Sequence, residues 1–276
     1  MEIPPTAGSS RASQRTLLVG FGKLGARLAH ELSGEGADVF ALRRTDSELP
    51  VGATGIVADI ASPLTRPLPD VDSVVITVPP SGAVGGYRSA LENLARALPS
   101  PPRRTVFVSS TGVFEGAPSQ PRLTERDEPG VLTTRARGLF EGEVAAHELF
   151  SAVVVRPAGI YGPGRDFLVR RVRDGIPVDH RRWTNRIHEV DLARAVHALL
   201  EMPDPPALLH AVDARPAPLG DVVRHVARRL AVDTPPDTGA EESGHVLDGT
   251  LLNTVLSSLT YPTYAEGYDA MLAPTD

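Results

Sequence analysis

The chain has 276 residues, 41% of them hydrophobic, which is enough for one large α/β domain with a small second lobe. The formal net charge of -6 argues against a general binder of nucleic acid or of membrane surfaces. Because the sequence contains no cysteine, disulfides, thiolate chemistry and cysteine-based zinc sites are excluded, and we expect no metal site. No apolar run approaches the roughly 20 residues of a membrane span. Residues 1–14 lack the apolar segment of a secretory signal, so we expect a disordered tail and a cytoplasmic protein.

The most informative stretch begins at residue 16. Leu17–Val19 is an apolar run short enough for a buried strand. A G-x-G-x-x-G pattern follows, made of Gly20, Phe21, Gly22, Lys23, Leu24 and Gly25, and apolar residues at helical spacing come next. This order predicts a binding site for the pyrophosphate of a dinucleotide, with a plain strand–turn–helix as the alternative. Gly20 would form the turn, Gly22 would let the backbone approach the pyrophosphate, and Gly25 would let the helix pack closely.

A second strand is predicted over residues 37–42, and Arg43 and Arg44 follow it directly. In dinucleotide-binding sheets this strand end meets the adenine ribose, where an acidic residue holds the 2′-hydroxyl of NAD and an arginine accommodates the 2′-phosphate of NADP. The first acidic residue, Asp46, comes only after both arginines. The sequence therefore favours NADP as cofactor, with NAD possible. The alternative is that both arginines are ordinary surface residues.

Strands and helices alternate along the next part of the chain. Strands are predicted over residues 55–58, 74–78, 105–109 and 153–155, and helices over residues 86–98 and 133–150. This alternation predicts an α/β Rossmann fold, a doubly wound parallel sheet with helices on both faces. Further helices are expected near residues 167–174, 190–200 and 219–230, with one strand over 208–212 and a loop over 233–244. We expect a dinucleotide-binding core over residues 15–165 and a smaller substrate-side lobe over residues 166–276.

Six segments together give the chain a family resemblance. They are Gly20–Gly25, Ala58–Ile60, Val106–Phe114, Arg156–Gly164, Arg186–Leu192 and Tyr261–Gly267. In this order and spacing they resemble the extended and atypical short-chain dehydrogenase/reductases. The chain is most similar to the atypical branch of NAD(P)-dependent epimerase/dehydratase-like, or nucleoside-diphosphate-sugar epimerase-like, proteins. The resemblance covers about residues 16–270.

The resemblance implies a role for each matching position. It places Asp59 and Ile60 beside the adenine, and Ser109 and Ser110 beside the nicotinamide, with Ser110 at the position of the catalytic serine. The further cofactor contacts that it implies are Thr77, Val78 and Pro79 at the ribose and pyrophosphate, and Pro157, Ala158, Gly159 and Ile160 at the nicotinamide carboxamide. Asp191 would hold the helix after His188. For these positions, ordinary strand ends and helix caps are the alternative.

The chain departs from the family at the catalytic pair. Active members use a tyrosine and, four residues later, a lysine that lowers the tyrosine pKa, so that the tyrosine can exchange a proton with the substrate oxygen. Aligning the helix through residues 139–143 puts Arg135 at the tyrosine position and Leu139 at the lysine position. Lys23 is the only lysine in the chain, and Val19 precedes it at this spacing. The sequence therefore contains no Tyr-x-x-x-Lys pair.

Other residues could replace part of this chemistry. Arg135 could bind an anionic substrate group. Tyr161 could donate a proton, with a packing role as the alternative. His188 could titrate near neutral pH or serve as a structural hydrogen-bonding residue. Six arginines in the substrate-side segment suit either a phosphate or carboxylate substrate or a solvated face: Arg165, Arg170, Arg171, Arg181, Arg182 and Arg186.

Three functions remain open on the sequence. The pattern favours an NADP-dependent reductase or epimerase/dehydratase-like enzyme that acts on a small polar or anionic metabolite. Its candidate catalytic residues are Ser110, Tyr161 and Arg135. The alternatives are a dinucleotide-binding scaffold or sensor without catalysis, and a redox-neutral biosynthetic enzyme on the same fold. The sequence indicates neither the substrate nor the oligomeric state.

Overall fold

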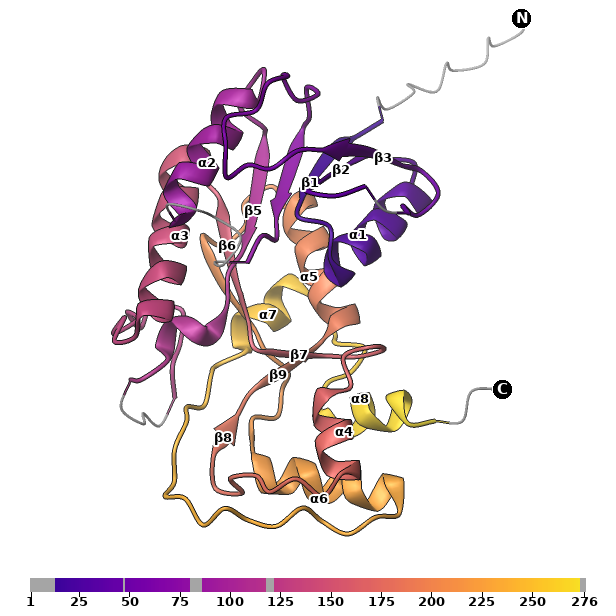
Figure 1. The fold of residues 1–276 in the computed structure, drawn as a ribbon, viewed down its shortest axis with the longest axis vertical. Helices are drawn as coiled ribbons and strands as arrows, with labels where there is room; N and C mark the ends of the chain where they lie inside the picture. Colours follow the sequence, from indigo (N-terminus) through magenta and orange to yellow (C-terminus); the bar gives the residue numbers. More distant parts are fainter. Residues whose placement is uncertain (1–12, 47, 80–85, 118–121, 274–276) are drawn as a thin grey trace, which may run out of the picture.

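A parallel sheet forms the centre of the computed structural model, which describes residues 13–46, 48–79, 86–117 and 122–273 (Figure 1). Within these residues the main sheet has seven strands in the order β10–β6–β5–β4–β1–β2–β3, and all neighbours are parallel. The strands are β1 (Arg15–Val19), β2 (Asp38–Arg43), β3 (Ala53–Val57), β4 (Ser73–Ile76), β5 (Arg104–Val108), β6 (Val153–Pro157) and β10 (Leu208–Ala211). This arrangement confirms the predicted doubly wound α/β fold.

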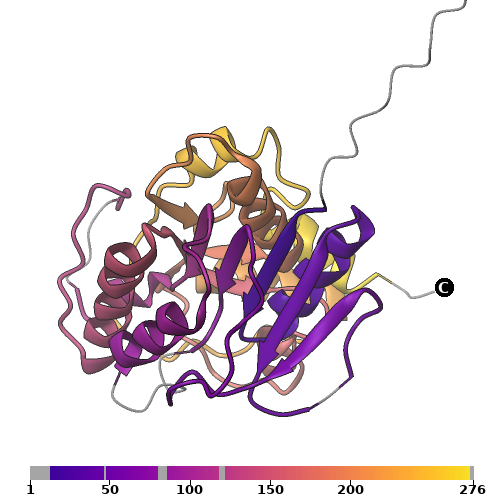
Figure 2. The ribbon, with the colours of Figure 1, turned by 90° about the horizontal axis from the view of Figure 1, so that it is seen from above.

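Helices cover both faces of the sheet (Figure 2). One face carries α1 (Lys23–Gly34), α5 (Glu189–Glu201) and α7 (Thr250–Val255), and the other carries α2 (Gly86–Ala97) and α3 (Thr134–Phe150). Side chains alternate across a strand, so neighbouring residues of β1 enter different cores. Leu18 packs with α1 and α5, whereas Leu17 and Val19 pack with α2 and α3. The near-continuous apolar runs of the sequence thus reflect strands that are buried on both faces.

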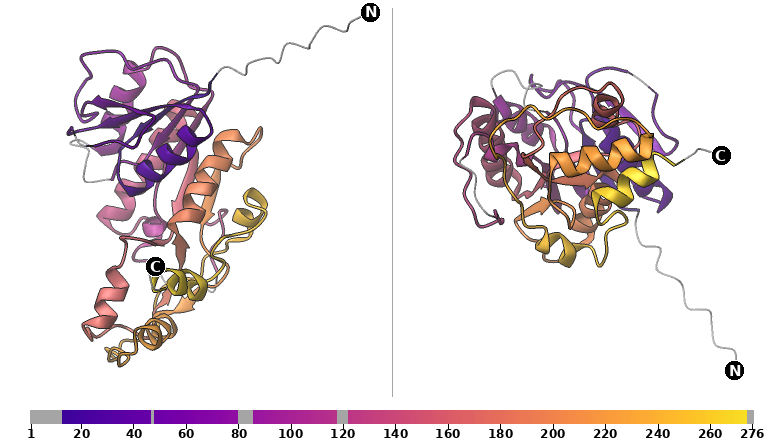
Figure 3. Two further views of the ribbon diagram at one scale, coloured as in Figure 1. Left: turned by 90° about the vertical axis from the view of Figure 1, so that its right-hand side faces the viewer. Right: turned by 90° about the horizontal axis from the view of Figure 1, so that it is seen from below.

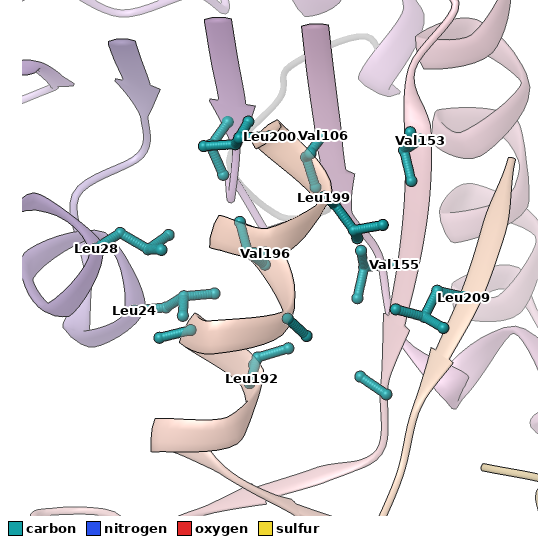
Figure 4. Packing of buried hydrophobic residues seen from close by; sticks show 14 of the residues in the cluster. Leu24, Leu28, Val106, Val153, Val155, Leu192, Val196, Leu199, Leu200 and Leu209 are labelled. Atoms are coloured by element: carbon teal, nitrogen blue, oxygen red, sulfur yellow. The ribbon is translucent and has the colours of Figure 1, made fainter. Parts of the chain in front are cut away.

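The apolar face of α5 shows how one layer is held to the sheet (Figure 4). Leu192, Val196 and Leu199 recur at helical spacing and are fully buried. They pack in one cluster with Val106 and Val155 of the sheet, and the same cluster includes residues of α1. The cluster therefore joins the strands that carry the candidate site to the helix that follows the glycine pattern.

A smaller group of elements lies at one end of the sheet (Figures 1 and 3). It contains α4 (Phe167–Arg173), α6 (Leu219–Leu230), α8 (Tyr264–Met271) and the antiparallel pair β8 (Trp183–Thr184) and β11 (Ala217–Pro218). A separate apolar cluster holds it together, with Val172, Val222 and Tyr268 among its members. The parallel pair β7 (Gly159–Tyr161) and β9 (Arg186–His188) lies where this group meets the sheet. Residues beyond 165 contribute to both parts, since β10, α5 and α7 belong to the main sheet and its cover.

The observed elements agree with most predicted ranges within one or two residues. The sequence analysis did not predict α7, α8, the 3-10 turn η2 (Thr111–Phe114) or the two- and three-residue strands β7, β8, β9 and β11. These elements have only two to eight residues each, so they give at most about two helical turns of apolar periodicity and a weak pattern. Of the expected tail, residues 1–12 lie outside the described residues. Within the described ranges, no helix combines the length and the apolar character needed to cross a membrane.

One buried ionisable side chain affects how the fold responds to pH. His210 of β10 is fully buried, and the centre of its ring lies 5.7 Å from that of Phe114. Neither ring nitrogen has a hydrogen-bond partner among the described residues. Burial, with a smaller contribution from the charge of Arg156, lowers the pKa of His210 to about 4, while Asp127 and Asp248 act in the opposite direction. The folded protein therefore holds a neutral imidazole.

We predict that His210 makes the fold sensitive to acid. The folded-state pKa lies below the ordinary value of 6.5, so the unfolded chain takes up a proton first as the pH falls. The contribution of neutral His210 to the free energy of unfolding is fully present above pH 6.5 and is lost as the pH falls towards about 4. Urea unfolding should show the parent losing about 2 kcal/mol more than His210→Met between pH 7.5 and pH 5. An identical pH dependence for both proteins would contradict the assignment.

Candidate functional site

The candidate site lies where the strand order of the sheet reverses. The chain runs from β1 to β2 and β3 on one side, then returns to β4, β5 and β6 on the other. The connections after β1 and β4 therefore leave in opposite directions, and a crevice opens at the carboxyl ends of the strands. Four cavities lie along this crevice and are joined through shared lining residues.

The first cavity, the fingerprint cavity, has a volume of about 560 Å³. It brings together most of the predicted cofactor-binding residues from the ends of β1, β2, β3 and β4. Those in its lining are Gly20, Phe21, Gly22, Arg43, Arg44, Asp59, Ile60, Thr77, Val78 and Pro79. Segments up to 59 residues apart in the sequence thus form one continuous wall.

The first two glycines of the pattern have different structural roles. Gly20 has φ +92°, and a Cβ there would lie 2.9 Å from Thr77 Oγ1, whose hydroxyl donates to the Gly20 carbonyl at 2.8 Å. Gly20 is therefore required by the turn itself. A Cβ at Gly22 would meet no atom within 4 Å, because this position faces the open crevice. Gly22 is thus the residue that keeps space for a ligand.

The start of α1 suits an anion. The helix begins at Lys23, directly after Gly22, and no side chain caps its first N–H groups. Such groups attract a phosphate, both through hydrogen bonds and through the helix dipole. Together with the space at Gly22, this geometry fits the pyrophosphate of a dinucleotide. Gly25 fits its predicted packing role, since a Cβ there would lie 3.0 Å from the Gly20 carbonyl oxygen.

The two arginines after β2 differ in their surroundings. Arg43 is buried, and its Nη2 lies 2.8 Å from Asp46 Oδ1, so Asp46 neutralises the arginine that it follows. Arg44 is exposed and also lines the fingerprint cavity. Across the cavity, Asp59 is exposed and accepts a hydrogen bond from the Ala61 N–H at 3.0 Å. The predicted ribose end of the site is therefore more basic than acidic on the side of β2.

The second cavity, the serine cavity, continues from the first. Its volume is about 260 Å³, and it shares Gly22, Thr77, Val78 and Pro79 with the fingerprint cavity. The other predicted cofactor and catalytic residues in its lining are Lys23, Leu24, Gly25, Ser109, Ser110, Arg135, Pro157 and Ile160. Leu139, which the sequence alignment placed opposite the family's lysine, also lines it and is 2% exposed. Leu139 therefore presents an apolar surface to the serine cavity.

Ser110 and Arg135 connect the serine cavity to a third cavity, the outer cavity, of about 620 Å³. Ser110 Oγ accepts a hydrogen bond from the Gly112 N–H at 3.0 Å, which caps η2. Arg135 lies in the first turn of α3, is 62% exposed, and has its Nη1 3.5 Å from Glu115 Oε2. Ala158 and Gly159 line the outer cavity but not the serine cavity. The structure thus places two of the three candidate catalytic residues together.

Tyr161 is placed differently from the other two. Its ring stacks on Tyr268 with centres 4.8 Å apart, and its hydroxyl donates to the Thr263 carbonyl at 3.3 Å. The side chain is 3% exposed, and burial raises the pKa of its hydroxyl. It lines neither cavity that contains Ser110. The contacts of Tyr161 are therefore those of a packing residue, which was the alternative to proton donation.

His188 and Asp191 hold the start of α5. His188 Nδ1 accepts from the Val190 N–H at 3.3 Å, and burial lowers the His188 pKa. Asp191 accepts from the backbone N–H groups of Thr260 and Tyr261, at 2.7 and 2.8 Å. His188 thus caps α5, whereas Asp191 ties the first turn of this helix to the backbone of residues 260 and 261.

The fourth cavity, the arginine cavity, contains four of the six predicted basic residues. Its volume is about 590 Å³, and its lining includes Arg165, Arg171, Arg182 and Arg186. Asp179 is the only acidic residue in its described lining. Arg170 instead pairs with Asp166, and Arg181 reaches the Gly239 carbonyl. Arg165, whose Nε lies 3.3 Å from Glu189 Oε2, also lines the serine cavity, and Arg182 lines the outer cavity.

A buried ion pair that was not expected from the sequence lies behind Ser109. Glu143 of α3 and Arg156 of β6 lie with Glu143 Oε2 and Arg156 Nη2 2.7 Å apart. Arg156 stood inside a recognised motif, but nothing in the sequence indicated that its partner was Glu143. His245, which lines the outer cavity, was also missed; it follows a long loop without periodic pattern.

We predict that Gly22→Val abolishes dinucleotide binding while the sheet stays folded. The new Cβ would lie in the crevice with no protein atom within 4 Å, and the less favourable helix cap should cost only about 1 kcal/mol. Titration calorimetry with NADP⁺ checks this result. Gly34→Val is a matched control, since its Cβ also meets no atom within 4 Å and the residue lines none of the four cavities. If Gly22→Val binds NADP⁺ with the affinity of the parent, the glycine pattern forms only a turn and no dinucleotide site.

Comparison with known proteins places the chain in a family. No family model and no curated protein matches the sequence. Among solved structures it is similar to a candidate NAD-dependent epimerase/dehydratase from Methylobacillus flagellatus, with 30% identity, a TM-score of 0.82, and coverage of 94% of this chain and 97% of the other. It resembles in fold the human epimerase family protein SDR39U1 with NADPH, at 17% identity and TM-score 0.78, covering 94% and 99%.

A third solved structure has the same fold with a different bound nicotinamide dinucleotide. It is the UDP-glucuronic acid 4-epimerase from Bacillus cereus in complex with NAD, with 16% identity, a TM-score of 0.73, and coverage of 94% and 97%. The likeness at 30% identity spans nearly the whole of both chains and agrees with the crevice described above. This chain therefore belongs to the NAD-dependent epimerase/dehydratase family.

Proposed function

We propose that this protein is an NADP-dependent reductase, or an epimerase/dehydratase-like enzyme, that acts on a small polar or anionic metabolite without the Tyr–Lys pair. The main support is the continuity of the crevice. The fingerprint and serine cavities share four residues, and the serine and outer cavities share Ser110 and Arg135. A dinucleotide in the first two cavities would have its nicotinamide end beside a substrate in the third.

The bound cofactor would supply or accept a hydride at its nicotinamide ring. The protein's own contribution is to bind and orient. The turn at Gly22 and the first N–H groups of α1 would hold the pyrophosphate. The adenine end would lie between the ends of β2 and β3, beside Arg44 and Asp59.

The basic side of the fingerprint cavity supports NADP as the preferred cofactor. Arg44 is exposed in the lining, so its guanidinium can bind a 2′-phosphate through charge-assisted hydrogen bonds. Arg43 already pairs with Asp46, and a 2′-phosphate would compete with that carboxylate. We therefore assign the larger share of the selectivity to Arg44.

We expect Arg44→Ala to weaken NADP⁺ binding by about 1.5–3 kcal/mol and to leave NAD⁺ binding nearly unchanged. The reason is that only NADP⁺ carries the phosphate that Arg44 would bind. Titration calorimetry with both dinucleotides gives the two affinities. Arg96→Ala removes an exposed arginine outside the crevice and is the matched control. Equal affinities of the parent for NAD⁺ and NADP⁺ would end the NADP assignment.

The groups around Ser110 support reduction more than oxidation. Ser110 accepts from the Gly112 N–H, so its own hydrogen remains available for a substrate carbonyl oxygen. Arg135 cannot act as an acid or base near neutrality, because a guanidinium keeps its charge there. It can instead hold an anionic group. With Tyr161 bonded to Thr263, a water in the outer cavity becomes the favoured proton donor. None of these groups is a base suited to deprotonating an alcohol.

The arginines of the last two cavities support a substrate with an anionic group. Arg135 and Arg182 both line the outer cavity, and Arg182 and Arg186 line the arginine cavity. A carboxylate or phosphate on the substrate could bind Arg182, or compete with Glu115 for Arg135. This arrangement is the reason to place anionic carbonyl compounds first among candidate substrates.

We predict measurable reduction of an activated carbonyl by NADPH, much slower oxidation of the corresponding alcohol, and a rate that falls in Ser110→Ala. Losing the carbonyl's hydrogen-bond donor should slow the hydride step by roughly 10²-fold. Stopped-flow absorbance of the nicotinamide across ketones, aldehydes, keto acids and keto sugars measures these rates. Ser110→Thr, which keeps the hydroxyl and the cap on η2, should retain most of the rate. NADPH consumption with none of these compounds would favour the scaffold function, and an equally fast Ser110→Ala would remove Ser110 from the mechanism.

A further inference from the structure

Behind the serine cavity, the side chain of Glu143 is fixed by a buried ion pair with Arg156. Glu143 and Arg156 are 5% and 3% exposed. Arg156 Nε lies 3.0 Å from Glu143 Oε1, and Nη2 lies 2.7 Å from Oε2, so the pair is bidentate. Two parallel charge-assisted bonds fix the plane of the carboxylate as well as its position. Glu143 therefore presents Oε1 in one direction only.

That oxygen determines how the hydroxyl of Ser109 is used. Ser109 follows β5 directly and is buried, and its Oγ donates to Glu143 Oε1 at 2.6 Å. A carboxylate bound to arginine can only accept, and a serine hydroxyl has a single hydrogen. That hydrogen is already used on Glu143. Ser109 can therefore offer only lone pairs to the serine cavity, which it lines.

The neighbouring Ser110 has the opposite hydrogen-bonding role, since its hydroxyl can donate to a ligand. Ser110 Oγ accepts from the Gly112 N–H at 3.0 Å, so it keeps its hydrogen for donation. Ser110 lines both the serine cavity and the outer cavity, whereas Ser109 lines only the serine cavity. Ser110 can thus donate a hydrogen bond to a ligand where the serine and outer cavities meet. Ser109 can only accept one, from a ligand in the serine cavity.

We propose that Ser109, fixed by Glu143 and Arg156, accepts a hydrogen bond from the carboxamide N–H of the nicotinamide. The carboxamide carries both N–H donors and a carbonyl acceptor, so an acceptor-only hydroxyl selects its amino side and sets which way the group is turned. This inference rests on the dinucleotide site proposed above and assigns the residue that orients its reactive end. Ser109 acts here as a specificity-determining contact for the nicotinamide.

Titration calorimetry with three ligands on the full chain tests this contact without measuring activity. NADP⁺ carries the carboxamide, 3-acetylpyridine adenine dinucleotide phosphate replaces it with a methyl ketone that has no N–H, and 2′-phospho-ADP-ribose lacks the ring entirely. Ser109→Ala should weaken NADP⁺ binding roughly fivefold to tenfold and leave the other two affinities unchanged. The variant keeps the Glu143–Arg156 pair and removes the acceptor together with the hydrogen bond that Ser109 donates to Glu143.

Two further variants separate this contact from general damage to the site. Ser109→Thr keeps the hydroxyl and should restore the preference for NADP⁺ over the acetylpyridine analogue. Ser110→Ala removes the neighbouring hydroxyl, and should leave that preference as in the parent. Equal losses for all three ligands in Ser109→Ala, or no loss for any, would overturn the proposal.

The parent protein alone provides a second test, which holds even if a variant does not fold. It should bind NADP⁺ more tightly than the acetylpyridine analogue. Equal affinity for these two ligands would overturn the role of Ser109 while leaving the dinucleotide site intact. Failure of the parent to bind any of the three would instead overturn the proposed function, and this inference with it.

Discussion

Parallel strand pairing fixes where every candidate functional segment leaves the sheet. Val19 of β1 pairs with Ile76 of β4, and Ile76 pairs with Phe107 of β5. The next residues therefore emerge side by side: Gly20 after β1, Thr77 after β4, and Ser109 one residue past the end of β5. The Ser109 N–H in turn bonds the Val155 carbonyl of β6 at 2.7 Å. Since apolar side chains on both faces hold this register, the crevice is a consequence of the core.

The helix α3 carries the positions at which the family resemblance led us to expect a Tyr–Lys pair. Residues 135, 139 and 143 follow one another at four-residue spacing along one face. The first is an exposed arginine, the second a buried leucine, and the third a carboxylate bound to Arg156. Arg135 thus pairs with Glu115 at the rim of the outer cavity, while Glu143 makes a buried polar contact with Ser109. Removing one partner of a buried pair such as Glu143–Arg156 costs about 3–5 kcal/mol, so it also ties α3 to β6.

The predictable parts of this protein are those that follow from periodicity or backbone geometry. The buried strands appear as apolar runs such as Val74–Ile76, and the crevice follows from the glycine pattern once it lies between a strand and a helix. The orientation of Tyr161 towards Tyr268 could not be predicted, because it depends on α8, which contacts it from over 100 residues away. The pairing of Glu143 with Arg156 likewise depends on how α3 lies against β6, which the sequence does not encode in any local pattern.

Hydrogen–deuterium exchange with and without NADPH tests most directly whether the crevice is a single dinucleotide site. We predict slower exchange in four separate segments at once, residues 20–25, 58–60, 77–79 and 108–110, because they line the fingerprint and serine cavities. The amides of α6 should be unaffected, since this helix lies in the separate apolar cluster. Protection of all four segments would support the account. Exchange that NADPH leaves unchanged, or protection confined to segments outside the crevice, would contradict it.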